Sequence, residues 1–94
     1  MVLLVYKSTL ESEVMEYLAD ATIRYFTKWQ QVQGQGSSSN PHMDNHVWPG
    51  TNHVLAVMCE KPEKEIIFKI VKTIREKVPG QGIKAFSLPV LDHT

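Results

Sequence analysis

The residues with the most recognisable chemistry lie in the middle of the chain, where three of its four histidines fall between positions 42 and 53. Neutral imidazole is a common ligand of transition metals, and His42 and His46 could share one face of a helical turn. Asp44 would add an oxygen ligand, and His53 could complete the set. The same histidines could instead serve only as hydrogen-bonding loop residues, so a metal site and a structural role both stay open.

The run Gly34-Gln35-Gly36-Ser37-Ser38, just before these histidines, has the residue types of an anion site. Glycines allow backbone amides to approach an anion, and serine hydroxyls add further donors. The run lacks the lysine of a Walker motif and does not open a helix, so it meets neither common nucleotide motif. A flexible hinge at the start of a loop is an equal alternative.

Two further residues could contact a ligand. Lys84 follows the glycine turn 79–82 and is the cation best placed to meet a phosphate. Trp48 would either anchor its loop on a neighbouring surface or cover a ligand. Cys59 has apolar neighbours and is predicted to be an inert core residue rather than a nucleophile.

The composition excludes several classes of protein. A chain of 94 residues holds one domain, 1–94, and its ten basic and ten acidic residues argue against nucleic-acid binding. A single cysteine excludes an internal disulfide and a CxxC motif. The apolar runs are too short for a membrane span or a signal peptide, so we expect a cytoplasmic protein.

The remaining charged residues show no catalytic pattern. Glu11, Glu13 and Glu16 are predicted to form the solvated face of a helix rather than an acid/base pair. No nucleophile beside a base can be inferred, so we do not expect an enzyme.

The hydrophobic pattern predicts the element order β-α-β-β-α-β. The first strand is expected to be central and buried on both faces, and Ser8 or Thr9 to cap the first helix. Two right-handed crossovers then give an α+β, ferredoxin-like fold, a four-stranded antiparallel sheet with both helices on one face. The expected strands are 2–6, 24–33, 53–59 and 83–88. The buried stripe of the first expected helix consists of Leu10, Val14, Tyr17, Leu18 and Ala21. The buried stripe of the second expected helix, which begins near Pro62, consists of Ile66, Ile67, Ile70, Val71 and Ile74.

The connection between the two middle strands, residues 34–52, is about 19 residues long. Hairpin loops usually have ~2–5 residues, so this one is typical of a functional or disordered loop. We expect a long loop that is mobile without a ligand, at least at 36–40, because Ser-Ser-Ser-Asn offers no apolar anchor.

The predicted strands carry more apolar side chains, Tyr25 and Trp29 among them, than one exposed sheet face normally shows. Both predicted helices pack on the opposite face of the sheet, so neither can cover this one. We therefore expect a partner subunit to cover this face.

Several motifs together resemble a known family. They are the Gly-x-Gly exit at 34–36, the long loop, and Gly80-Gln81-Gly82 before Ala85-Phe86-Ser87-Leu88-Pro89-Val90. This combination resembles the PII superfamily of trimeric signalling proteins. The segments 25–29, 41–42 and His46-Val47-Trp48-Pro49-Gly50 are similar to those of small PII-like proteins described as nitrogen-regulator or transcriptional-regulator homologues.

The resemblance implies a PII-like homotrimer whose sheets face inward. It implies a small effector, an adenine nucleotide or similar, bound in clefts between subunits. The long loop would then signal to a protein target such as a membrane transporter. The positions that match the family's ligand-binding residues are Gly34, Gly36, Ser37, Ser38, Gly80, Gln81, Gly82 and Lys84.

The chain departs from the nitrogen-sensing members in three places. Ser37-Ser38-Ser39 replaces their Arg-Gln-Lys stretch, no tyrosine lies in 34–53, and the sequence ends at Thr94 without their basic C-terminal segment. The cofactor therefore stays open between an adenine nucleotide, another small ligand and a divalent transition metal. The metal alternative is a module for metal efflux, carried by His42, His46, Asp44 and His53.

Overall fold

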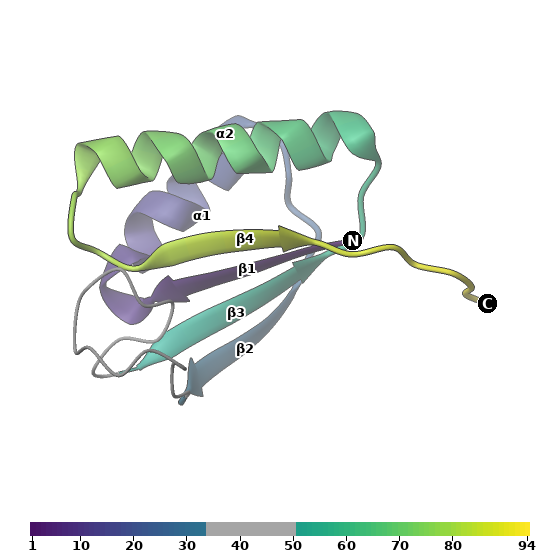
Figure 1. Cartoon of the computed structure of the whole chain (residues 1–94), viewed down its shortest axis with the longest axis horizontal. Coiled ribbons are helices and arrows are strands. Elements are labelled where there is room, and N and C mark those ends of the chain that lie inside the picture. The colour runs from purple at the N-terminus through teal and green to yellow at the C-terminus, as the bar shows by residue number, and fades with distance from the viewer. Residues whose placement is uncertain (34–50) are drawn as a thin grey trace.

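The apolar runs of the sequence form one four-stranded antiparallel sheet in a computed structural model, which describes residues 1–33 and 51–94 (Figure 1). The strand order β2-β3-β1-β4 and the two helices on one face confirm the predicted ferredoxin-like fold. The elements are β1 (Val2–Lys7), a 3₁₀ turn η1 (Ser8–Leu10), α1 (Glu11–Asp20), β2 (Thr27–Val32), β3 (Asn52–Val57), α2 (Lys61–Lys77) and β4 (Ile83–Ser87).

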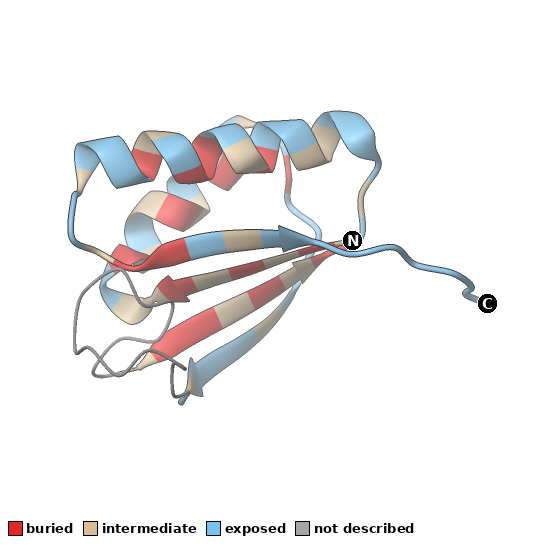
Figure 2. Cartoon of the chain, in the orientation of Figure 1, coloured by how far each residue is buried: buried red, intermediate tan, exposed pale blue. Residues whose placement is uncertain are grey.

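The core lies between the sheet and the two helices (Figure 2). Because side chains alternate along a strand, β1 buries every second residue against the helices and leaves Leu3 and Val5 half-buried on the other face. In the single chain β1 is therefore buried on one face, not on the two that the sequence predicts. The largest fully buried side chains are Tyr6, Leu4, Leu10, Leu18, Leu55, Ile67, Ile74, Val2, Val14 and Val57.

The first helix begins differently from the prediction. Neither Ser8 nor Thr9 caps α1, because the 3₁₀ turn comes first and its flanking residues make no side-chain capping bond. The Ser8 hydroxyl instead accepts a hydrogen bond from Thr51, and the Thr9 hydroxyl donates one to Gln81. Both hydroxyls therefore join distant parts of the chain rather than the helix end.

The second helix has a capping box that the sequence analysis missed. The Glu60 side chain accepts a bond from the Glu63 backbone amide, and the Glu63 side chain accepts one from the Glu60 amide at 3.0 Å. Pro62 lies in the first turn, as predicted. Ile66 is wrongly assigned to the buried stripe, since it is 41% exposed while Ile67 is fully buried.

The strand β3 is shorter than predicted and ends before Cys59. Cys59 is half-buried beyond the strand end and not part of the core itself. Burial, together with the nearby carboxylates of Glu63 and Glu60, raises the pKa of its thiol. A protonated thiol is a weak nucleophile, which agrees with the predicted inertness.

The first and last strands are also joined beyond the end of β4. The Met1 ammonium donates to the Leu88 carbonyl at 3.0 Å, and the Leu88 amide donates to the Met1 carbonyl at 2.9 Å. Among the described residues, neither helix has the length and apolar character needed to cross a lipid bilayer.

The turn between α2 and β4 contains Gly80 in the left-handed region, with φ of 86°. An added Cβ would meet no atom within 4 Å, so only the backbone conformation disfavours a side chain here. We expect Gly80→Ala to lower the free energy of unfolding by about 1–2 kcal/mol. Gly80→Asn should cost clearly less, because asparagine enters this region more readily. Urea denaturation of the three proteins measures both changes, and equal losses for alanine and asparagine would contradict the explanation.

Candidate functional site at the glycine-turn edge

Three segments that are distant in sequence meet at one end of the sheet (Figure 1). The Lys7 amide donates to the Gly82 carbonyl at 2.9 Å, and the Ser8 amide donates to the Thr51 carbonyl at 3.0 Å. These bonds place the end of β1, the residue before β3 and the turn before β4 side by side. We call the residues 7–9, Thr51 and 80–82 the glycine-turn edge.

The side chains of the glycine-turn edge are mainly hydroxyls and one amide. Thr51 Oγ1 donates to Ser8 Oγ at 2.8 Å, and Thr9 Oγ1 donates to Gln81 Oε1 at 2.9 Å. Both pairs are neutral and partly or fully accessible. The edge therefore offers neutral donors and acceptors for a polar ligand, and its one charged side chain is Lys7.

The structure brings some of the predicted ligand-binding residues to this edge. Gly80, Gln81 and Gly82 form its turn, and Lys84 is exposed two residues further on, opposite Val5 in the sheet. The other predicted residues lie outside the described ranges, and their prediction stays untested; they are Gly34, Gly36, Ser37, Ser38, Trp48, His42, Asp44 and His46.

His53, the fourth predicted metal ligand, is buried in β3 with only 8% of its surface exposed. Its Nδ1 accepts a hydrogen bond from the Gln31 backbone amide at 3.2 Å, and its Nε2 lies 4.0 Å from Glu11 Oε1. Within residues 1–33 and 51–94, no three His, Cys, Asp or Glu side chains are grouped to hold a metal ion.

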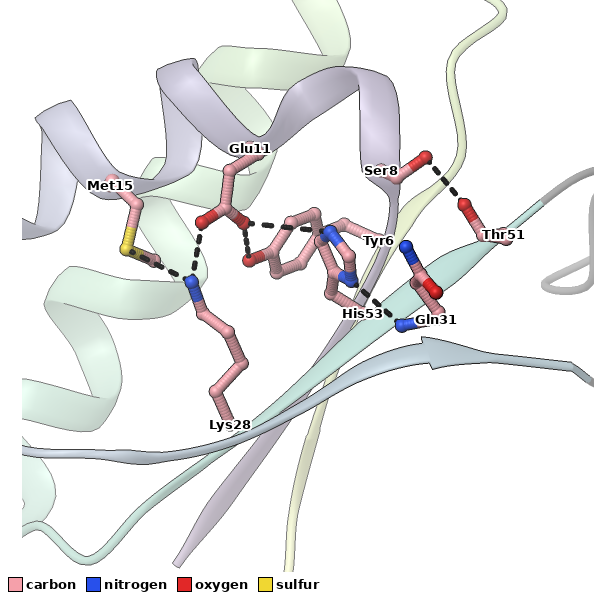
Figure 3. Close-up of polar contacts among 8 residues, drawn as sticks. All are labelled: Tyr6, Ser8, Glu11, Met15, Lys28, Gln31, Thr51 and His53. Atoms are coloured by element: carbon pink, nitrogen blue, oxygen red, sulfur yellow. Dashed lines mark hydrogen bonds and ion pairs between the residues drawn. The ribbon is translucent and has the colours of Figure 1, made fainter.

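A polar cluster lies beside this edge, between α1 and the sheet (Figure 3). The Glu11 carboxylate accepts a hydrogen bond from the Tyr6 hydroxyl at 2.5 Å and pairs with the Lys28 ammonium group. The His53 ring packs edge-on against Tyr6, with ring centroids 5.6 Å apart. We call Tyr6, Glu11, Lys28 and His53 the Glu11 cluster.

The prediction that Glu11 belongs to a solvated helix face is therefore wrong. Glu16 is exposed, as expected, but Glu11 turns toward the sheet because Lys28 lies on the face of β2 that points to the helices. The position of Lys28 in the alternating pattern of its strand indicates that this lysine needs an acidic partner. Lys28 alternates with the open-face residue Trp29, and a cation at a core-facing strand position needs a carboxylate from the opposing helix.

Two opposing effects act on the pKa of Glu11. Partial burial raises it, but the hydrogen bonds from Lys28 and Tyr6, with the positive charge of Lys28, outweigh burial and lower the pKa below its ordinary value. The pKa of Tyr6 is strongly raised, first by burial and then by its bond to the Glu11 carboxylate. At neutral pH the cluster thus contains a carboxylate that accepts from a neutral phenol and a cation.

Comparison with known proteins supports the fold. No family model matches the chain, and no curated protein matches it significantly. A solved structure from Thermus thermophilus, described as a PII-like signalling protein, is similar with a TM-score of 0.56 and 23% identity. The match covers 90% of this chain and 79% of that protein. The chain has a PII-like fold.

Within this PII-like fold, the glycine turn lies beside the residues that flank segment 34–50. Asn52 pairs with Val32 across β2 and β3, and Thr51 bonds to Ser8 next to the turn. The described part of the predicted ligand site therefore lies beside Thr51 and Asn52, and Asn52 in turn pairs with Val32. The Glu11 cluster joins the same region to α1 through Tyr6 and Lys28.

The Glu11 cluster gives a pH-dependent prediction. Because folding lowers the pKa of Glu11, its contribution to stability is complete above its ordinary value of about 4.5 and is lost as the pH falls below it. We expect Glu11→Gln to lower the free energy of unfolding by about 1 kcal/mol at pH 7, a figure reduced for partial solvent exposure. The difference from the parent protein should shrink toward pH 3.

Urea denaturation at pH 7, 5 and 3 measures this effect. Glu16→Gln is the matched control, because Glu16 lies on the same helix, is exposed and should change stability by less than about 0.5 kcal/mol. An equal loss for Glu11→Gln at pH 7 and pH 3 would show that the carboxylate charge is not what stabilises the cluster.

Proposed function

We propose that this protein is a non-enzymatic regulator that binds a small effector at the glycine-turn edge and signals through residues 34–52. The proposed effector is an adenine nucleotide or a ligand of similar chemistry. It would bind in clefts between the subunits of a homotrimer, and the signal would reach a protein target such as a membrane transporter.

The observation that supports this proposal is that the end of β1 is bonded both to the glycine turn and to Thr51, the residue that follows segment 34–50. Lys7 and Ser8 are adjacent, and their amides bond to Gly82 on one side and to Thr51 on the other. A ligand at the turn would therefore lie close to the chain that enters β3. A ligand shifts a conformational equilibrium only when it contacts the two states differently, and this proximity offers such contacts.

The chemistry of the edge fits a polar ligand with phosphate groups. The turn 80–82 provides the exposed Gly80, whose backbone amide can approach an oxyanion, whereas Gly82 is buried in the single chain. Ser8, Thr9 and Thr51 provide hydroxyls. Lys84 supplies a positive charge two residues from the turn. Specificity for one nucleotide would then depend on hydrogen bonds more than on charge.

The open face of the sheet supports the proposed trimer. No described helix covers this face, and its outer strands expose Trp29 by 50% and Phe86 by 41% (Figure 2). Between them the central strands present half-buried apolar side chains, so the apolar surface is continuous. These residues are Leu3, Val5, Val54 and Ala56.

The effector proposal predicts stabilisation by nucleotides. We expect at least one of ATP, ADP, AMP and cyclic AMP to raise the melting temperature in a thermal shift assay. At a hundred times its dissociation constant a ligand adds about 2.7 kcal/mol, which corresponds to a shift of several degrees in a domain of this size. Gln81→Glu should reduce this shift, because it places a negative charge in the turn.

Lys72→Gln is the matched control for charge, because it changes the net charge by the same one unit at an exposed position of α2. Its nucleotide shift should equal that of the parent protein. If no nucleotide shifts the parent protein, the nucleotide effector is excluded. A shift only with zinc, nickel or copper would favour the loop histidines as ligands.

The trimer proposal predicts a mass of three chains in light scattering at micromolar concentration. Phe86→Glu should give monomers, because it places a charge in the apolar open face. Ile66→Glu is the matched control, since Ile66 is equally exposed, at 41%, but lies on α2. A monomeric parent protein, or equal dissociation by both variants, would contradict the proposal.

A further inference from the structure

Three polar side chains gather on the open face of the sheet, at the end where the turn from α2 leads into β4 (Figure 1). Lys7 of β1 is paired directly with Asn52 of β3, and Lys84 of β4 is paired with Val5 of β1. Each of the three alternates with a buried residue of its own strand, so all three lie on the face that the helices leave uncovered. We call Lys7, Asn52 and Lys84 the basic end of the open face.

The three side chains are close enough to contact one small ligand. The Lys7 amide donates to the Gly82 carbonyl at 2.9 Å, so Lys84, two residues further along β4, is the diagonal neighbour of Lys7. Directly paired residues have Cβ atoms about 4.5–5.5 Å apart, and diagonal neighbours are about 7–8 Å apart. Lysine has a long and flexible side chain, so both ammonium groups can turn toward a ligand beside Asn52.

No carboxylate neutralises these two lysines within residues 1–33 and 51–94. None of the four strands contains an acidic residue. The ion pairs among the described residues both involve Glu11, which pairs with Lys28 on the helix side of the sheet. Lys7 and Lys84 therefore place two positive charges side by side on a face that is otherwise mainly apolar, and an anion would offset their repulsion.

Asn52 adds a buried acceptor that lacks a donor. The residue is 4% exposed, and its Oδ1 has no hydrogen-bond partner in the part of the chain that the structure describes. Such an atom is unfavourable unless a ligand or a water molecule pairs with it. A carbonyl oxygen can only accept, so its missing partner must carry a hydrogen.

A ligand reaches this enclosed oxygen only when a neighbouring side chain moves. Asn52 lies between Val32 of β2 and Lys7 of β1 in the sheet. Valine is stiff because its side chain branches at Cβ, whereas Lys7 is only half-buried and has a flexible stem. Lys7 is therefore the neighbour that can turn aside and then bind the ligand with its ammonium group.

We propose that the basic end of the open face binds hydrogen phosphate. The phosphate oxygens accept hydrogen bonds from Lys7 and Lys84, and the phosphate hydroxyl donates to Asn52 Oδ1. Sulfate has a similar shape but no hydrogen to donate at neutral pH, so one of its oxygens would face Asn52 Oδ1. The site thus selects phosphate against sulfate. It lies on the sheet rather than in the glycine turn, and it requires neither the nucleotide nor the trimer.

Isothermal titration calorimetry of the full chain tests this site, with sodium phosphate and sodium sulfate titrated separately at pH 7 and equal ionic strength. We expect sulfate to bind about tenfold more weakly than phosphate, which is the effect of one lost hydrogen bond. Lys7→Gln and Lys84→Gln should each weaken phosphate binding about tenfold. Lys72→Gln is the matched control, because it removes the same charge from an exposed position of α2 and should leave the affinity unchanged.

Asn52→Leu separates the acceptor from the charges. Leucine is similar in size but offers no acceptor, so the dissociation constants of phosphate and sulfate should become similar. Equal binding of both anions by the parent protein would overturn the site, as would no phosphate binding at all or an equal loss in Lys72→Gln. The comparison of the two anions on the parent protein decides this even if Asn52→Leu does not fold.

Light scattering on the same samples keeps this site apart from the proposed trimer. A trimer that binds no phosphate would overturn only the phosphate site, and a monomer that binds phosphate would overturn only the trimer.

Discussion

Both helices pack on the same face of the sheet, and this one-sided burial determines the rest of the structure. Every second strand residue must enter a single core, so burial alternates along the whole of β1 and along β3 from His53 to Val57. Any polar residue at a core-facing position must find a partner there, as Lys28 does with Glu11. Apolar residues at the other positions, such as Trp29 and Phe86, stay uncovered in the single chain.

The Glu11 cluster shows how the fold includes charge in a partly buried place. An isolated Lys28 ammonium group facing the core would be strongly unfavourable, and pairing with one carboxylate removes most of that cost. The carboxylate then has a second oxygen to satisfy, and the Tyr6 hydroxyl does so. Helix α1 is thereby connected to β1 and β2 by directional polar bonds, in addition to apolar contacts, which do not by themselves fix the position of the helix along the sheet.

Periodicity predicted the fold well but predicted the polar contacts poorly. The apolar stripes and the β-formers in 2–6, 53–59 and 83–88 are local signals, and they predicted the element order and the layer arrangement. The role of Glu11 depends on a residue 17 positions away. No local pattern distinguishes Glu11 from Glu13 or Glu16, because the difference lies in which one faces Lys28 across the core.

The candidate site was predicted in part, for similar reasons. The glycine turn 80–82 has a recognisable composition, and the family resemblance assigned it to the ligand site. The hydroxyls of Ser8, Thr9 and Thr51 were missed or assigned to helix capping, since their partners lie far away in the sequence. The left-handed backbone of Gln31, with φ of 55°, could not be predicted, because the acceptor of its amide, His53, lies 22 positions further along the chain.

The central position of β1 has a consequence for how the protein folds. Among the described residues β1 pairs with β3 and β4, and Met1, just before β1, is bonded to Leu88, so this strand is completed by residues that lie far along the sequence. Chains dominated by such distant pairings fold more slowly than chains with local contacts. During synthesis, the apolar side chains of β1 would stay without their sheet partners until β3 and β4 have emerged from the ribosome.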